Sequence, residues 1–318
     1  MIYDYLDKLK EIIKKLTFEA SICKRTDPKK KKESCMDAIL LAVIKTRLSI
    51  EKLLEIYNII EKGIALNLDF FFNNYSIISL WNFIHPKVLD FAKNLFSQTP
   101  KGLGTPNAAS GEGELMFILL HPNIKKPTRG DLSITSNGEE HIFELKGALP
   151  RVTTAVRGFT FCSRSLEIAA KYGINPNTPN TPNASAAIEN ENRAQNEIYV
   201  KQLNDLPLNQ RKAFIWEWLE ATGGVFPTER RDKILTNVLP NGNFDQKGLQ
   251  KEIVKGFFAY MCNSNNFHSM ILLGDGNKVK IVPRNPNIFN SMVDKGLIKI
   301  KSDYFRIAQP NTLGWYIE

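Results

Sequence analysis

Two acidic residues and a lysine lie close together in the segment GDLSITSNGEEHIFELKG, which covers residues 130–147. Carboxylate oxygens are preferred protein ligands of Mg²⁺, which also keeps several of its water molecules. A lysine beside such a cation can offset charge in a phosphoryl transition state or assist the attacking water. Asp131, Glu144 and Lys146 are therefore residue types suited to metal-dependent hydrolysis of a phosphodiester.

A two-residue turn at Asn137-Gly138 would bring these three side chains together. The dipeptide predicts a hairpin, because a type I′ turn needs positive φ at both central residues. Counting outward from the turn places Asp131 directly opposite Glu144, and opposed residues have Cβ atoms about 4.5–5.5 Å apart. Lys146 is two residues beyond Glu144 and shares its face of the strand. The pairs nearer the turn are Ser136–Glu139, Ile134–His141 and Leu132–Phe143.

Opposed carboxylates of like charge destabilise a hairpin unless something compensates them. A bound Mg²⁺ would do so, with Asp131, Glu144 and the backbone carbonyl of Leu145 as ligands, and Mn²⁺ could substitute for it. The alternative is a surface hairpin on which Asp131, Glu144 and Lys146 form a solvated salt-bridge cluster. His141 falls on the hairpin face away from the carboxylates, so we expect a structural role for it.

These motifs resemble the PD-(D/E)XK nuclease superfamily of restriction, phage and repair nucleases. Gly130-Asp131 stands for the first half of the motif, with Pro127 displaced, and Glu144-Leu145-Lys146 stands for the second. The resemblance covers roughly residues 105–165, with the strands at 268–283 as a candidate extension of it. It implies an α/β fold with a restriction-endonuclease-like core, in which helices flank a central mixed β-sheet. It also implies a Mg²⁺-dependent nuclease that hydrolyses DNA phosphodiester bonds, with an endonuclease as the favoured type.

The resemblance implies further site residues. Many members bring a glutamate from the helix before the hairpin, and the segment GEGEL offers Glu114, with Glu112 as the less favoured choice. The helix after the second strand lies near the substrate backbone in the family. This position implies phosphate contacts for Arg151, Arg157 and Arg164, with ordinary surface charge as an equal alternative.

The net charge favours a polyanionic partner. Lysine and arginine outnumber aspartate and glutamate by 42 to 33, which gives a formal charge of +9. DNA is the first candidate, RNA is an alternative, and an anionic membrane surface ranks below both. The run Lys29, Lys30, Lys31 and Lys32 predicts a solvated loop or, in a sharper interpretation, a loop that contacts phosphate. A homodimer would suit cleavage of both strands, but no residue pattern demands one.

Hydrophobic periodicity and turn residues divide the chain into three parts. We expect a helical N-terminal region over 1–100, a nuclease-like core over 101–173 and 241–318, and a loop and helical insertion over 174–240. Expected strands outside the hairpin lie at 268–273 and 278–283, with a β-rich end over 296–309. Expected helices lie at 35–47, 49–62, 86–96, 163–172, 186–204, 208–221, 228–238 and 245–262.

The remaining features concern location and the second hypothesis. Four cysteines at 23, 35, 162 and 262 lack metal-binding spacing, which favours reduced thiols in a cytoplasmic protein, in a bacterial cell or a phage-infected host. The longest aliphatic run, 38–44, is too short to span a bilayer, and the charged amphipathic start is not a signal peptide, so secretion is not expected. The alternative function is a non-catalytic nucleic-acid-binding or virion-associated protein on the same fold.

Overall fold

The computed structural model describes residues 7, 10–15, 28–73, 77–96, 113–146, 161–174, 197–221, 225–274, 277–300 and 315–317. The chain forms two compact units. Unit 1 comprises Met1–Ala148, Asn265–Arg284 and Ile317, and unit 2 comprises Leu149–Ser264, Asn285–Tyr316 and Glu318. Unit 1 contains the predicted hairpin.

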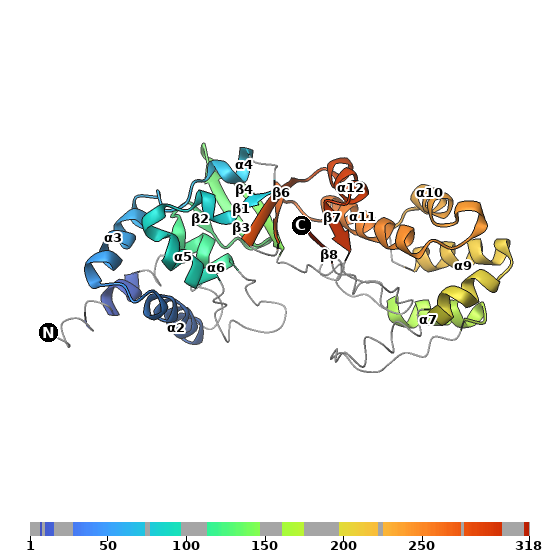
Figure 1. Ribbon diagram of the computed structural model, residues 1–318, viewed down its shortest axis with the longest axis horizontal. Coiled ribbons are helices and arrows are strands. Elements are labelled where there is room, and N and C mark those ends of the chain that lie inside the picture. The colour runs from blue at the N-terminus through green and yellow to red at the C-terminus, as the bar shows by residue number, and fades with distance from the viewer. Residues whose placement is uncertain are drawn as a thin grey trace. The chain divides into compact units, whose positions relative to one another are not determined.

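A six-stranded mixed sheet forms the centre of unit 1 (Figure 1), with strand order β1-β6-β5-β4-β3-β2. Only β4 and β5 pair in parallel, and the other neighbours are antiparallel. The predicted α/β class and mixed sheet are therefore confirmed. The strands are β1 (Ile78–Ser79), β2 (Ile124–Lys125), β3 (Leu132–Ser136), β4 (Glu139–Lys146), β5 (Ser269–Leu273) and β6 (Lys278–Pro283).

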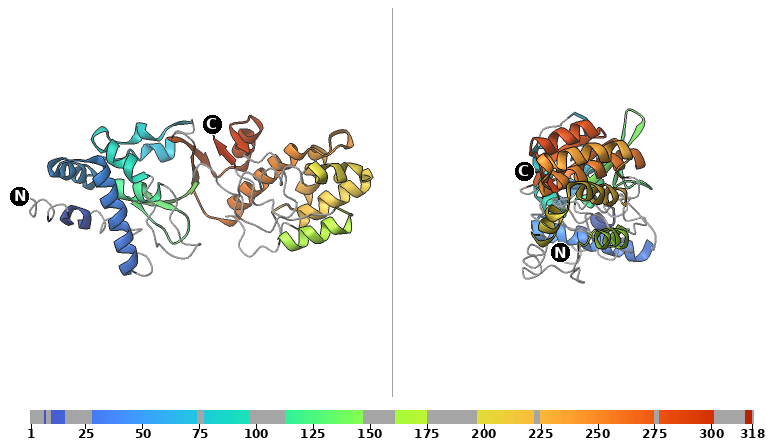
Figure 2. Two further views of the ribbon diagram at one scale, coloured as in Figure 1. Left: turned by 60° about the horizontal axis from the view of Figure 1, so that its bottom comes forward. Right: turned by 90° about the vertical axis from the view of Figure 1, so that its right-hand side faces the viewer.

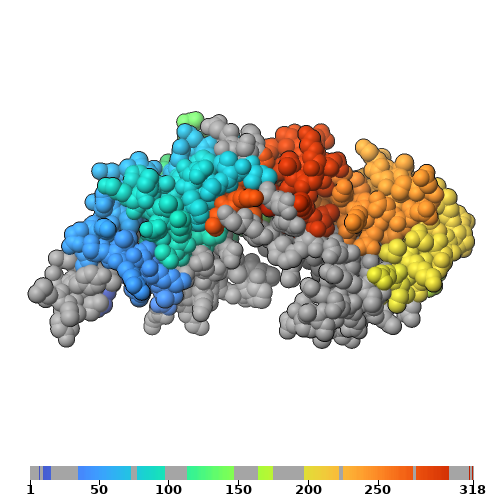
Figure 3. Space-filling model, viewed as in Figure 1, coloured from blue at the N-terminus to red at the C-terminus, as the bar shows by residue number. Residues whose placement is uncertain are grey.

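Helices from the first 120 residues share one hydrophobic core with this sheet. Phe71 shows how the layers meet, because its ring lies 5.6 Å from both Phe117 on a helix and Phe143 on β4, measured between centroids. Figure 3 shows the helical layer, blue to teal, as a packed surface. Its elements are α2 (Pro28–Thr46), α3 (Ile50–Glu61), α4 (Asp69–Asn73), η2 (Leu80–Phe83), η3 (Pro86–Val88), α5 (Leu89–Phe96) and α6 (Glu114–Leu120).

The lysine run does not form the predicted loop. Helix α2 begins at Pro28, so the backbone of Lys29, Lys30, Lys31 and Lys32 is helical. Proline fits the first position of a helix because its missing N–H would have no helical partner there, and lysine is a good helix former. The loop interpretation was wrong because it treated a lysine run as a solvated loop and did not weigh these two local preferences.

Unit 2 is mainly helical, with a two-stranded sheet of β7 and β8. Helix α11 packs against α10 and α12, and α10 packs against α9 (Figures 1 and 2). The rings of Phe258 and Phe289 stack with centroids 3.9 Å apart and join α11 to α12. The elements are α7 (Phe161–Lys171), a helix over 197–205, α9 (Leu208–Glu220), α10 (Thr228–Val238), η5 (Pro240–Gly242), α11 (Gln246–Ser264), α12 (Pro286–Asp294), β7 (Ile298–Ile300) and β8 (Trp315–Ile317).

The two units do not follow the predicted boundaries of the three parts. The N-terminal helices belong with the sheet, since their apolar side chains and those of the strands form one core. Helix α11 belongs with the helices of unit 2, although the sequence placed it beside the sheet. The insertion segment 175–196 and the end segment 301–314 lie outside the described residues.

Two observations bear on the expectations about membranes and cysteines. None of the described helices is long and apolar enough to cross a bilayer. Cys35 is disulfide-bonded, whereas Cys262 is a buried free thiol. The prediction of four reduced thiols is therefore wrong at Cys35, because spacing in the sequence does not show which cysteines meet in space.

Candidate active site

The predicted hairpin is confirmed, and its register is the one counted from the turn. Asn137 and Gly138 have φ values of 52° and 82°, as a type I′ turn requires. Leu132 pairs with Phe143, and the ladder continues to the turn without a bulge. The core-facing and solvent-facing sides of both strands are thereby fixed, because a slip of one residue would exchange them.

The regular ladder ends before Asp131 and Glu144. The Asp131 amide donates to the carbonyl of Phe143, the residue opposite Leu132, at 3.1 Å. The Asp131 carboxylate turns back onto β4, where Oδ2 accepts from the amide of Leu145 at 2.8 Å. The predicted pair Asp131–Glu144 lies beyond the last ladder pair, Leu132–Phe143, and there the Leu145 amide bonds to the Asp131 side chain.

Gly130 makes this departure from the ladder sterically accessible. Its φ is +87°, a conformation that residues with a Cβ rarely adopt. A Cβ at this position would lie 2.5 Å from Cγ2 of Ile142, which is far too close. Only glycine therefore fits directly before Asp131 without local rearrangement.

We expect Gly130→Ala to destabilise unit 1 more than Gly138→Ala. Both glycines have positive φ, so both variants carry the left-handed backbone penalty of about 1–2 kcal/mol, but no atom lies within 4 Å of a Cβ at Gly138. The clash with Ile142 should cost Gly130→Ala about 1–3 kcal/mol more, by overpacking. Calorimetric unfolding of both variants measures the difference, and equal losses of stability would contradict the steric argument.

One ammonium group already lies between the two predicted carboxylates. Lys146 Nζ donates to Glu144 Oε2 at 2.9 Å and lies 3.6 Å from Asp131 Oδ2. The prediction that Lys146 shares a face with Glu144 is confirmed by this contact. The two acids are therefore close enough to contact the same cation.

A second lysine, which the sequence analysis missed, connects Glu114 to this group. Lys126 Nζ lies 2.7 Å from Glu114 Oε2 and 3.6 Å from Asp131 Oδ1. Its side chain is largely buried, whereas its neighbour Lys125 is exposed. Lys126 directly follows β2, a strand of only two residues, so no alternating pattern in the sequence marked the buried lysine.

Burial is the largest single influence on the pKa values of both Glu144 and Lys146. It raises the pKa of the Glu144 carboxyl above its ordinary value, and the negative charge of Asp131 adds to the rise against the opposing effect of Lys146. Burial also opposes the charged form of Lys146, but Asp131 and Glu144 outweigh it and raise the pKa of this ammonium. Lys146 is therefore held in its charged form between its two partners.

Asp131 and Glu144 fit a hard divalent cation, because both offer carboxylate oxygens and both already contact one positive charge, the Lys146 ammonium. Asp131 and Glu144 offer carboxylate oxygens, which suit Mg²⁺. The N–H and C=O of a strand residue point to the same side, so the bond from the Leu145 amide to Asp131 directs the Leu145 carbonyl toward Asp131 as well. Among the described residues, no group of three or more His, Cys, Asp and Glu side chains converges as cation ligands.

Of the other predicted phosphate contacts, one belongs to unit 2 and the rest are described only as backbone or not at all. Arg164 is exposed in unit 2, where its guanidinium lies 3.8 Å from Glu220. Arg151 and Arg157 lie outside the described residues, as does Glu112. For the run 29–32 the structure describes only the helical backbone.

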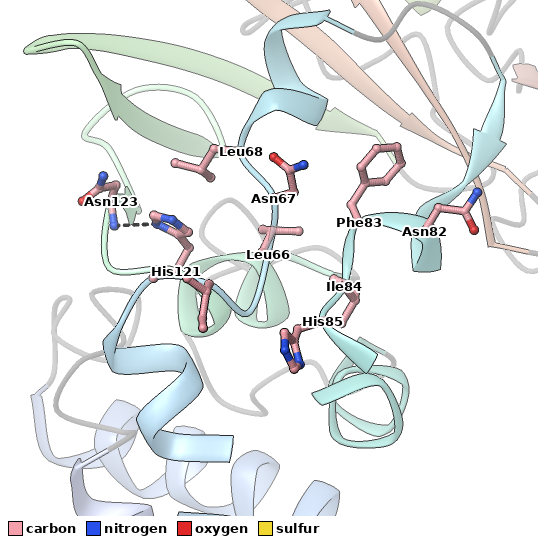
Figure 4. Close-up of a pocket in the computed structure, with 11 residues that line it drawn as sticks. Leu66, Asn67, Leu68, Asn82, Phe83, Ile84, His85, His121 and Asn123 are labelled. Atoms are coloured by element: carbon pink, nitrogen blue, oxygen red, sulfur yellow. Dashed lines mark hydrogen bonds between the residues drawn. The ribbon is translucent and has the colours of Figure 1, made fainter. Parts of the chain in front are cut away.

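A separate hollow of 460 Å³ lies on unit 1, and none of the candidate site residues lines it. His121 lies at its edge, and its Nδ1 accepts from the Asn123 amide at 3.1 Å (Figure 4). Burial lowers the pKa of His121 and favours the neutral ring that this hydrogen bond requires. His141 likewise lies apart from the carboxylates, in contact with the rings of Phe72 and His268.

No protein-family model, no curated protein and no solved structure matches this chain. The functional argument therefore depends on the geometry around β3 and β4. That geometry consists of three acidic side chains, two lysines and a glycine-dependent break in the ladder.

Proposed function

We propose that this protein is a Mg²⁺-dependent nuclease that hydrolyses DNA phosphodiester bonds, on a core of the PD-(D/E)XK kind. The observation that carries the proposal is the position of Lys146 Nζ, which contacts the carboxylates of both Asp131 and Glu144. Two acids that share one ammonium at the end of a buried hairpin can share a divalent cation. A mixed sheet flanked by helices is compatible with such a core.

The roles of the residues follow from their contacts. Asp131 and Glu144, with the Leu145 carbonyl, would hold the cation, and Mn²⁺ would fit the same oxygen donors. A cation bound there supplies polarisation of a phosphoryl oxygen and a lowered pKa for a bound water. Lys146 offsets negative charge on the phosphoryl group as the water attacks. The Leu145 amide keeps Asp131 oriented toward β4.

The test is incubation of the full chain with supercoiled and linear DNA, in Mg²⁺ and in EDTA. The proposal expects cleavage in Mg²⁺ and none in EDTA, and conversion of the supercoiled form identifies an endonuclease. An RNA of the same sequence tests the alternative substrate. Intact DNA under all conditions, with protein that is folded, would contradict the proposal.

The non-catalytic alternative also has an observation in its favour. All three acids of the cluster have a lysine partner, so two ammonium groups offset most of the charge of three carboxylates without a metal ion. A nucleic-acid-binding protein of charge +9 would need nothing more than this stable fold. Tight DNA binding that is independent of Mg²⁺ and yields no product would select this function.

The raised pKa of Glu144 predicts how cation binding depends on pH. Protons and cations compete for this carboxylate, so affinity for Ca²⁺ should fall as pH decreases through the raised pKa, at a higher pH than for an ordinary glutamate. In the metal-free protein the sign is opposite, since a raised folded pKa gives stability that is lost as pH rises through it.

Thermal unfolding with and without Ca²⁺, between about pH 4 and pH 8, measures both effects. The stabilisation by Ca²⁺ should grow with pH and disappear in Glu144→Gln. A stabilisation that does not depend on pH would show that the cation binds elsewhere.

A further inference from the structure

Lys126 lies between two acids, and its contacts differ from those of Lys146. Its ammonium forms a close ion pair with Glu114 at 2.7 Å and a longer contact with Asp131 Oδ1 at 3.6 Å. The Lys126 side chain is 12% exposed and that of Glu114 is 4% exposed, so water screens this pair only weakly. Lys146 faces the other oxygen of Asp131. Each oxygen of Asp131 therefore faces a different lysine.

Glu114 reaches the candidate cation site through Lys126. Its Oε2 accepts a hydrogen bond from Lys126 Nζ. In the part of the chain that the structure describes, Glu114 does not converge with Asp131 and Glu144 as a group of three cation ligands. The Lys126 ammonium contacts both Glu114 and Asp131.

We propose that Lys126 is a positioning residue that sets the cation affinity of the site, and that Glu114 anchors Lys126 instead of binding the cation. This inference rests on the proposed function. The Lys126 ammonium faces Oδ1 of Asp131, whereas Lys146 faces Oδ2. It also places a positive charge beside the oxygens that receive the cation.

Lys126 should lower the cation affinity because its ammonium and the bound cation are like charges that repel each other in a half-buried site. A cation that binds Asp131 must approach an ammonium that Glu114 holds in place, and burial strengthens the repulsion relative to water. Removal of Lys126 alone deletes this repulsion and leaves the charge of Glu114. Removal of Glu114 alone deletes its negative charge and leaves the Lys126 ammonium beside Asp131. Removal of both deletes a neutral pair, so the two changes should offset one another.

The experiment is calorimetric titration of the full chain with Ca²⁺, without DNA. We expect Lys126→Gln to bind Ca²⁺ about tenfold more tightly than wild type and Glu114→Gln to bind it about tenfold more weakly. The double variant should return to within about threefold of wild type. Lys126→Arg, which keeps the charge, should resemble wild type, as should the control Lys125→Gln, which changes the exposed neighbouring lysine.

Two outcomes would overturn the inference while wild type still binds Ca²⁺. One is unchanged or weaker binding by Lys126→Gln, as expected if this lysine only supports the fold. The other is a double variant as weak as Glu114→Gln, which would make Glu114 a direct ligand. If circular dichroism shows that Lys126→Gln does not fold, the double variant and Lys126→Arg decide the question. Absence of Ca²⁺ binding by folded wild type would instead reject the proposed function, and this inference with it.

Discussion

Replacement of Lys146 by alanine should lower the rate of Mg²⁺-dependent DNA cleavage by about a hundredfold to ten-thousandfold. The lysine is charged, largely buried and in contact with both carboxylates, so its removal takes away the ammonium that they share. Cleavage of plasmid DNA under single-turnover conditions measures the loss. Lys278→Ala is the matched control, because it removes an exposed lysine from β6 of the same sheet.

The same variant should show a second effect, on stability. Without Lys146, the carboxylates of Asp131 and Glu144 lose the ammonium that they share. The unfolding temperature should therefore fall in EDTA and recover when Mg²⁺ is added. A variant that still cuts DNA at the wild-type rate would remove Lys146 from the mechanism.

Replacement of either predicted ligand should reduce both metal-dependent cleavage and metal binding. We expect Asp131→Asn and Glu144→Gln each to lower cleavage by at least about a hundredfold and to remove the stabilisation by Mg²⁺. Both substitutions keep the side-chain volume but remove the charge that a cation requires. Measurements of rate at increasing Mg²⁺ concentration separate lost affinity from lost chemistry.

Glu140→Gln is the control for these two variants. Glu140 lies on the same strand and the same face as Glu144, four residues away, and its carboxylate accepts a hydrogen bond from Ser133. It makes no contact with Lys146 in the described structure, so the rate should remain near that of wild type. A loss in Glu140→Gln equal to that in Glu144→Gln would indicate general damage to the hairpin.

The hairpin could be predicted from the sequence because its determinants are local. The Asn137-Gly138 turn and the alternation of apolar residues fixed the register of β3 and β4. The turn of Asp131 out of the ladder could not be counted in this way. It depends on the positive φ of Gly130 and on a side-chain hydrogen bond to the backbone of Leu145, neither of which belongs to a regular strand.

Two other features needed the three-dimensional structure. The parallel pairing of Leu145 with Ile271 joins segments far apart in the chain, and no local signal specifies such a partner. In the sequence, nothing distinguishes Lys126 from its neighbour Lys125, and its contact with Glu114 forms only in the folded chain. A long-range contact was therefore needed to find Lys126, the residue that we propose sets the cation affinity of the site.

A crystal structure of the protein grown with Mn²⁺ would show whether Asp131 and Glu144 hold one cation, because anomalous scattering identifies the ion. We expect a peak between the carboxylates of Asp131 and Glu144, within about 2.0–2.4 Å of an oxygen of each. A peak bound at other residues, with Lys146 still bridging both acids at saturating Mn²⁺, would contradict it.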